Sequence, residues 1–227
     1  MNDLIKQYDS LSDEEKTFLL IYKSQLFYFI NGIDNINDDN VEKYIARFEE
    51  FKRIIELPEN IFIKKSVFAG ISIDSFDNFL KSIDVIRQKI KGLYGKIILP
   101  KDMILYRCKS IKEKSNINNI CIGNFISTSC NFETAESFFS YEGTNVTYVL
   151  TVKEKTPVLI IPYSIKLIMK NNKKILKIVA NDDQDEIILF KDYLNIDLEK
   201  QEEENGEIFM FITADVFDKN KVNFKSP

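Results

Sequence analysis

Apolar side chains recur at helical spacing through the first ninety-odd residues of the chain. Ser12 to Glu15 form a capping-box sequence, in which the serine hydroxyl and the Glu15 carboxylate bind free backbone N–H groups at a helix start. Pro58 cannot continue a helix, and Gly92 is a helix stop signal. We therefore predict three helices with the approximate bounds 12–30, 38–57 and 75–91.

Short apolar runs follow, and they are typical of strands. We predict strands at 103–106, 124–126, 146–152, 158–161, 187–190 and 209–212. A short helix is predicted from Glu133 to Phe139, with Asn131 as its N-cap. Residues 164–180 fit either a helix and a strand or two strands. The acidic run Glu202 to Glu204 is predicted to be a solvated loop.

Helices that precede strands indicate an α+β fold rather than alternating βαβ units. The sequence has no internal repeat and no linker. We therefore predict a single domain over residues 1–227, with a helical part at about 1–95 and a mainly β core at about 96–227.

Composition narrows the class of protein. Apolar residues make up 44% of the chain, which is enough for a hydrophobic core. The net charge of −4 and the pI near 5.2 argue against a basic nucleic-acid surface. No stretch reaches the roughly 18 to 20 apolar residues of a membrane span. The N-terminus lacks the basic-then-apolar layout of a secretory signal.

The chain contains no histidine. That excludes Ser-His-Asp and Cys-His nucleophile systems, HExxH zinc sites and histidine acid–base chemistry. Its three cysteines have no regular spacing and are predicted to be reduced thiols, and glycine-rich phosphate loops are lacking. Any catalysis must therefore use carboxylates, hydroxyls, Arg, Lys or Tyr, and we expect no metal.

Three short elements carry candidate chemistry. Arg107 ends an apolar strand, Ser127-Thr128-Ser129 follow another, and Gln184-Asp185-Glu186 open a third. Each element alone has an ordinary explanation. The arginine could be solvated or ion-paired, and the three hydroxyls could bind backbone groups at a turn. The acidic residues could form a solvated turn. A calcium loop is disfavoured because the central Gly and distal Glu of an EF-hand are missing.

Together and in this order, the three elements resemble the R-S-E clade of mono-ADP-ribosyltransferases, the cholera-toxin-like family. Three further segments are similar to the family: Tyr22 to Asn31 to its first helix, Asn131 to Phe139 to the helix after its Ser-rich strand, and Asp185 to Phe190 to its late strand. The resemblance implies an α+β fold with an ADP-ribosyltransferase-like β-sandwich core and an N-terminal helical portion.

The resemblance also implies roles for individual residues, with NAD as substrate and no metal. Arg107 would anchor the NAD diphosphate, since a planar guanidinium donates bidentate hydrogen bonds to phosphate oxygens. Glu186 would stabilise the oxocarbenium-like charge that develops when the nicotinamide–ribose bond breaks. Ser127 would orient Glu186, while Thr128 and Ser129 would support the strand and the pocket.

Four other positions refine this expectation. Gln184 resembles the exoenzymes that modify an amide side chain, so an Asn or Gln acceptor is expected rather than Arg. The family's Gly after the motif Arg is Cys108 here, whose backbone would hold the nicotinamide amide. Phe132 and Phe138 are candidates for closing over the nicotinamide, with burial in the core expected for at least one of them.

The expected function is therefore mono-ADP-ribosylation of a target protein by a bacterial effector or toxin. Two alternatives stay open on the same fold: NAD glycohydrolysis, and a non-catalytic protein-interaction module. An unrelated α+β binding domain is a third. The expected partners are NAD and an acceptor protein of a host or other target, without nucleic acid. A soluble monomer is expected, secreted without a classical signal peptide and acting in a host cytosol.

Overall fold

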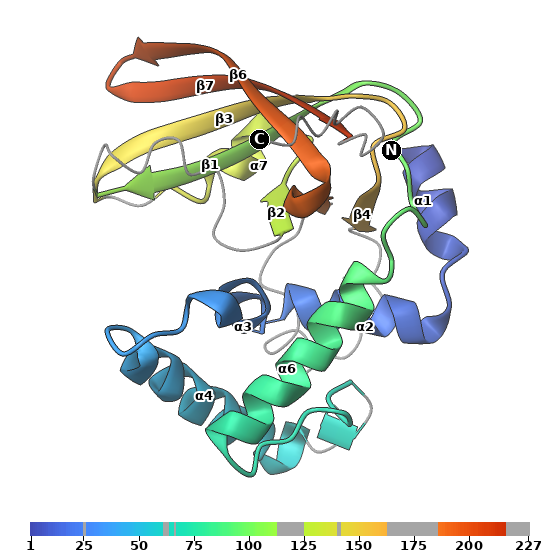
Figure 1. Ribbon diagram of the computed structural model, residues 1–227, viewed down its shortest axis with the longest axis vertical. Helices are drawn as coiled ribbons and strands as arrows, with labels where there is room; N and C mark the ends of the chain where they lie inside the picture. Colours follow the sequence, from blue (N-terminus) through green and yellow to red (C-terminus); the bar gives the residue numbers. More distant parts are fainter. Residues whose placement is uncertain are drawn as a thin grey trace, which may run out of the picture.

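The computed structural model describes residues 1–24, 26–60, 64–65, 67–112, 125–139, 142–162 and 186–216 of the chain, and it has an α+β architecture, as predicted (Figure 1). The helical elements are α1 (Asn2–Asp9), α2 (Asp13–Lys23), α3 (Phe27–Gly32), α4 (Val41–Ile55), α6 (Phe76–Lys91) and α7 (Phe132–Glu136), with 3-10 turns η1 (Ile33–Asn35), η2 (Pro58–Asn60) and η4 (Lys191–Tyr193). All but α7 and η4 precede the first strand.

Two sheets form the β part. The strands are β1 (Met103–Ile111), β2 (Phe125–Thr128), β3 (Thr144–Val152), β4 (Val158–Ile161), β5 (Glu186–Phe190), β6 (Leu194–Glu204) and β7 (Glu207–Val216). One sheet has the order β1-β3-β7-β6, with β3 and β7 parallel, and the other has the order β2-β5-β4. A bridge between Tyr106 and Ser129 connects β1 to the end of β2.

The predicted helix 12–30 is in fact two helices, α2 and α3, and the break falls at Ser24. The buried Ser24 hydroxyl donates to the Ile21 carbonyl and accepts from the Leu26 N–H. A serine side chain that bonds nearby backbone in this way competes with helical hydrogen bonding. The apolar periodicity continues across the break, which is why the sequence pattern predicted one helix.

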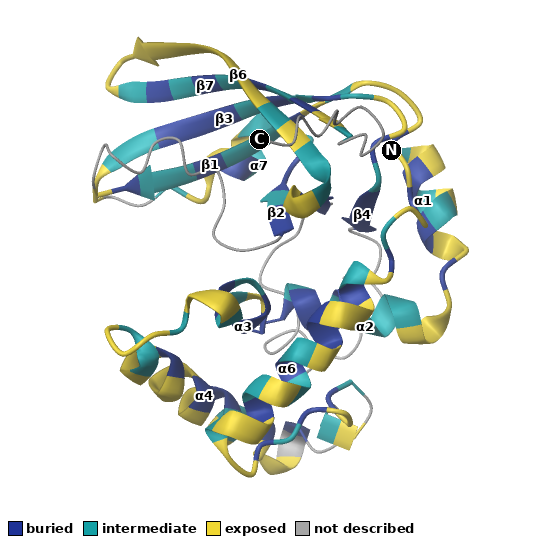
Figure 2. Ribbon diagram, viewed as in Figure 1, coloured by how far each residue is buried: buried dark blue, intermediate teal, exposed yellow. Residues whose placement is uncertain are grey.

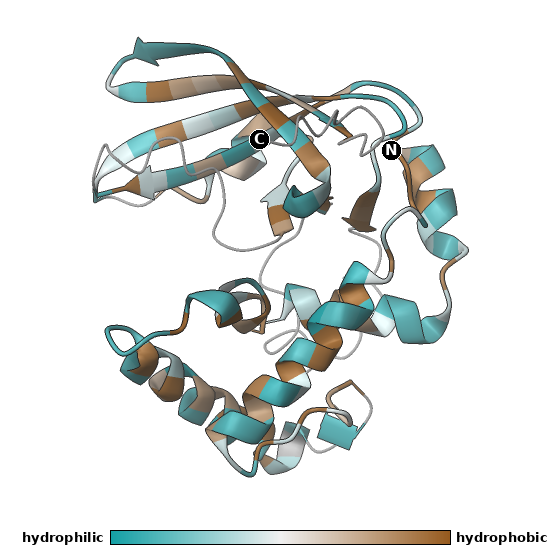
Figure 3. Ribbon diagram, viewed as in Figure 1, coloured by the Kyte–Doolittle hydropathy of each residue, from teal (hydrophilic) through white to brown (hydrophobic). Residues whose placement is uncertain are grey.

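The prediction of a loop at Glu202 to Glu204 was wrong, because these residues end strand β6. β6 pairs along its length with β7, and Asn205 and Gly206, both with positive φ, form the turn between them. An Asn-Gly pair is the preferred sequence for such a hairpin turn. The first half of β6, Leu194 to Leu198, alternates apolar and polar residues, whereas its second half is exposed and polar and resembles a loop in sequence (Figures 2 and 3).

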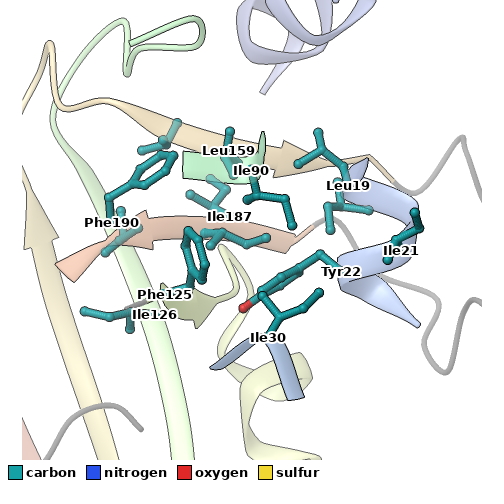
Figure 4. Close-up of a cluster of buried hydrophobic side chains, with 14 of the residues drawn as sticks. Leu19, Ile21, Tyr22, Ile30, Ile90, Phe125, Ile126, Leu159, Ile187 and Phe190 are labelled. Carbon is teal, nitrogen blue, oxygen red and sulfur yellow. The ribbon is translucent and has the colours of Figure 1, made fainter. Parts of the chain in front are cut away.

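One hydrophobic core links the helical part to the three-stranded sheet. Leu19 and Tyr22 of α2, Ile30 of α3 and Ile90 of α6 pack with side chains of β2, β4 and β5 (Figure 4). The Tyr22 ring makes an edge-on contact with Phe125, at 5.6 Å between centroids. The four residues of β4 and the five of β5 are all buried. Strand β5, which begins at Glu186, is therefore enclosed by packing on both of its faces.

Two further observations concern the described ranges alone. None of their helices is long and apolar enough to cross a membrane. Cys108 is a buried thiol and Cys130 is half-buried, while Cys121 lies outside these ranges, as does the ambiguous segment 164–180.

Candidate functional site

Glu186 is a buried carboxylate at the first position of the central strand β5, with 7% of the residue exposed. Its Oε1 atom accepts a hydrogen bond from the Ser127 hydroxyl on β2. Burying a carboxylate is costly unless it is paired and hydrogen-bonded. Glu186 is therefore held by directed contacts in one orientation.

The register of β2 on β5 explains how these two side chains meet. Ser127 lies opposite Ile188, which places Glu186 diagonally across the antiparallel pair, within reach of a side chain on the same face. Thr128, the next residue, donates from its hydroxyl to the Ile187 carbonyl at 2.6 Å. This bond adds a side-chain link between the same two strands. The Ser-Thr pair thus positions Glu186 and secures the strand that carries it.

Lys23, the last residue of α2, forms an ion pair with the second oxygen of Glu186, Oε2. Both side chains are nearly enclosed, with 11% of the lysine side chain exposed. The packing of Tyr22 against Phe125 brings this helix end onto the sheet. Both oxygens of the Glu186 carboxylate thus have a donor, one from a strand and one from a helix.

Arg107 of β1 reaches the same cluster from the larger sheet. Its Nη1 donates to the Ser127 carbonyl at 2.8 Å. Its Nε–H is buried and has no hydrogen-bond partner among the described residues. An unpaired buried donor is costly, so such an atom needs an explanation, and a bound acceptor supplies one. Arg107 is therefore suited to hold an anion beside Ser127.

Ser129 joins the two sheets next to Arg107. Its backbone N–H donates to the Tyr106 carbonyl at 2.8 Å and its carbonyl accepts from the Tyr106 N–H at 2.7 Å. Its hydroxyl accepts from the Asn131 N–H at 3.1 Å, and Asn131 in turn caps α7 through the Thr134 N–H. The predicted N-cap at Asn131 is confirmed. Ser129 thus links the backbone of the two sheets, and its hydroxyl binds the residue that caps α7.

The two candidate phenylalanines differ in their surroundings. Phe132, at the start of α7, is half-buried and makes an edge-on contact with the Tyr106 ring, at 5.7 Å between centroids. Phe138 lies beyond the end of α7, and 54% of it is exposed. Phe132 therefore packs beside the strand that carries Arg107, whereas Phe138 is outside the core.

Cys108 lies next to Arg107 in sequence, but its side chain contacts another part of the sheet. Its thiol hydrogen-bonds the Thr147 hydroxyl on β3 at 3.2 Å. Since that hydroxyl donates to the Glu207 carboxylate, the thiol is the donor in the first bond. Burial raises the pKa of the Cys108 thiol to about 11. The thiol is thus a structural group on the β1-β3-β7 face, and only the backbone of Cys108 remains a candidate for contact with a ligand.

The structure brings together three of the residues predicted from sequence, Arg107, Ser127 and Glu186. Gln184 lies outside the described residues, so its predicted role is not tested. Lys23 was missed: no motif marks it, and a lysine in the last turn of a helix is ordinarily explained by the helix dipole. The one available signal is its position directly after Tyr22, whose apolar face must meet the core.

The described residues contain no group of three or more His, Cys, Asp or Glu side chains that could hold a metal ion. The groups present are a carboxylate, a hydroxyl, an ammonium and a guanidinium. Such a set can bind an anion and stabilise a developing positive charge beside it.

No family model and no curated protein matches the chain. Among solved structures, it is similar to Vis toxin, an ADP-ribosyltransferase from Vibrio splendidus, with a TM-score of 0.48, 11% identity, and coverage of 96% of this chain and 79% of that one. It is also similar to an ADP-ribosyltransferase from Clostridium botulinum, with a TM-score of 0.45, 15% identity and coverage of 96% and 92%.

A third similar structure is a toxin from Paenibacillus larvae, also an ADP-ribosyltransferase, with a TM-score of 0.40, 15% identity and coverage of 96% and 94%. At these identities and TM-scores, none of the three similarities decides what this chain does. Its function must be inferred from its own side chains.

Proposed function

We propose that the chain is an NAD-dependent mono-ADP-ribosyltransferase that modifies a protein. The observation that carries the proposal is the buried Glu186 carboxylate, oriented by the Ser127 hydroxyl and linked through Ser127 to Arg107. These are the three residue types of the R-S-E pattern, and they lie in contact although up to 79 positions separate them in sequence.

Glu186 is the proposed catalytic residue. When the nicotinamide–ribose bond breaks, its electron pair leaves with nicotinamide and positive charge develops on the ribose ring. A carboxylate held in advance beside that ring stabilises the charge without having to reorganise. The acceptor side chain then forms a bond to the ribose carbon and loses a proton. Ser127 is a positioning residue, because it acts through Glu186.

Arg107 is the proposed anchor for the NAD diphosphate. Its buried and unpartnered Nε–H supports this role, because a phosphate oxygen would supply the acceptor that the described residues lack. Thr128 and Ser129 are proposed to hold the strands around it, and Phe132 and the Cys108 backbone to flank the nicotinamide. Gln184 is proposed to select an Asn or Gln acceptor.

Radiolabelled NAD incubated with a cell lysate tests the proposal. We expect the chain to label a discrete protein band, and mass spectrometry of that band to identify the modified residue. Release of nicotinamide without a labelled band would instead favour NAD glycohydrolysis. Neither signal, with no rise in melting temperature on addition of NAD, would contradict both enzymatic functions and favour an interaction module.

The substitution Glu186→Gln is expected to lower nicotinamide release at least about a hundredfold, because the amide carries no charge to offset the oxocarbenium. NAD binding, measured by calorimetry, should persist. Glu203→Gln on the exposed strand β6 is the matched control and should leave activity unchanged. Near-normal turnover by Glu186→Gln would contradict the proposed mechanism.

A further inference from the structure

Lys23 gives the site a second cation, and neither the sequence motifs nor the proposed mechanism uses it. Its ammonium group holds Oε2 of Glu186, while the Ser127 hydroxyl holds Oε1. A carboxylate in this arrangement has a donor on each oxygen. Each of these oxygens can accept one further hydrogen bond, so a ribose hydroxyl can join the two donors. It is the charge of the ammonium, rather than a lack of acceptor positions, that bears on the role proposed for Glu186.

The two partners differ in how readily they can move. Ser127 sits in the middle of β2, which is hydrogen-bonded to β5 and further secured by the Thr128 side chain. Lys23 is the terminal residue of a helix, and its charge lies at the end of a flexible four-carbon stem. The lysine is therefore the partner that can leave without disturbing a strand.

The charge of the cluster indicates where the ammonium would go. Lys23 and Arg107 are both linked to the Glu186–Ser127 pair, so within the described part of the chain these linked side chains bring two cations to one carboxylate. A diphosphate supplies two negative charges and would reverse this imbalance. In a nearly enclosed site, where water screens charges weakly, that attraction is stronger than at the surface.

An ammonium that stayed on Glu186 would also oppose catalysis. It would offset the negative charge that the proposed mechanism directs at the ribose ring. Transfer of the ammonium to a phosphate oxygen removes this conflict and leaves Oε2 to accept a hydrogen bond from the ribose.

We propose that Lys23 is a second NAD-binding cation, which exchanges the Glu186 carboxylate for the diphosphate when NAD binds. This inference rests on the proposed function. It makes Lys23 a positioning residue for Glu186 and a binding residue for NAD, contributed by the helical part of the molecule to a site otherwise built on strands.

The test compares steady-state nicotinamide release by Lys23→Met, Lys23→Arg and the unsubstituted chain. Methionine keeps the unbranched stem of the side chain and lacks the ammonium group. We expect Lys23→Met to raise KM for NAD about tenfold, the scale of one lost charged hydrogen bond, and to leave kcat within about threefold. Lys23→Arg should restore most of the KM. Lys16→Met, on the same helix but bonded to the Asp9 carbonyl, is the control and should leave both constants unchanged.

A kcat that falls while KM is unchanged would show that Lys23 stays on Glu186 during the reaction, and would overturn the proposal. Unchanged KM and kcat would overturn it as well. In both cases the unsubstituted chain still turns over NAD, so the proposed function survives. A chain that neither binds NAD nor releases nicotinamide would contradict the proposed function itself.

Lys23→Met leaves Glu186 buried without its cation, which can be strongly destabilising. ADP binding by calorimetry is therefore also compared between Glu186→Gln and the double variant Lys23→Met/Glu186→Gln, neither of which has the unpaired carboxylate. We expect the double variant to bind ADP about tenfold more weakly. Equal affinity of the two variants for ADP would overturn the proposed contact with the diphosphate.

Discussion

Arg107 and Cys108 are neighbours in sequence with opposite environments. Side chains of successive strand residues point to opposite faces of a sheet. Arg107 accordingly reaches Ser127, while the Cys108 thiol is buried against Thr147. The side chain of Cys108 therefore lies on the face of β1 opposite to that of Arg107.

This burial predicts the order in which the cysteines react. Because burial raises the pKa of the Cys108 thiol to about 11, only about one molecule in a thousand carries the reactive thiolate at pH 8. Cys130 is half-buried and should be reached sooner. We expect iodoacetamide at pH 8 to modify Cys130 well before Cys108, as measured by peptide mass spectrometry.

Denaturation in urea is the control for that experiment, and it should bring the two rates together. The thiolate fraction of Cys108 in the folded chain should increase only as the pH approaches the raised pKa. Equal rates in the folded chain at pH 8 would contradict the structural role assigned to this thiol.

At the scale of single elements, α2 connects the fold to the site. Its capping box is complete: the Ser12 N–H donates to Glu15 Oε2 at 2.8 Å, and the Glu15 N–H donates to the Ser12 hydroxyl at 3.3 Å. Glu15 also pairs with Lys96, beyond the end of α6. The same carboxylate thus begins the helix that ends at Lys23 and ties it to a neighbouring segment.

The pH dependence of the free energy of unfolding of Glu15→Gln tests this double role. Hydrogen bonds from Lys96 and Ser12 hold the pKa of Glu15 below its usual value. A lowered carboxyl pKa stabilises the folded state above the unfolded-state pKa, and this stability is lost as pH falls through the folded-state pKa. We expect Glu15→Gln to lower the free energy of unfolding by about 0.5 kcal/mol at pH 7, as measured by urea titration.

The difference from the unsubstituted chain should shrink as the pH is lowered below about 4. Glu14→Gln is the matched control, since Glu14 lies in the same first turn but has no part in the capping box. If the two chains differ in free energy of unfolding by the same amount at pH 7 and pH 3, the charge of Glu15 is not the cause of the difference.

The elements that the sequence predicted well are those with strong local signals. The capping box, the N-cap at Asn131 and the buried apolar runs of β4 and β5 needed no tertiary information. Strand β6 was missed because its second half is polar and exposed, and there only pairing with β7 holds it in a strand. The ion pair of Lys23 with Glu186 was missed for the same kind of reason: the two residues are 163 positions apart, and only the docking of α2 joins them.

At the scale of the whole molecule, the helical part and the strands share a single core. Side chains from α2, α3 and α6 pack directly on the sheet that carries Glu186 (Figure 4). Neither part can bury these apolar surfaces alone, and exposing them costs about 25 cal/mol for each Å². The single domain over residues 1–227 stays a prediction, and the shared core of the described residues suggests how to test it.

Because the helical part and the strands share one core, we expect the chain to unfold in a single cooperative transition. Far-UV circular dichroism reports mainly the helices, and near-UV circular dichroism reports the tyrosines, since the chain has no tryptophan. We expect the two signals to give the same midpoint in urea. Separate midpoints would mean that the helical part unfolds on its own and would contradict the single domain.

The β6–β7 hairpin offers a practical consequence. Its turn, Asn205-Gly206, is exposed, and it joins the edge strand β6 of the four-stranded sheet to its neighbour β7. Polar turn tips of this kind tolerate inserted residues better than packed segments do. A fluorophore or an affinity peptide placed between Asn205 and Gly206 would therefore report on the protein or capture its complexes while leaving Glu186 and its donors intact.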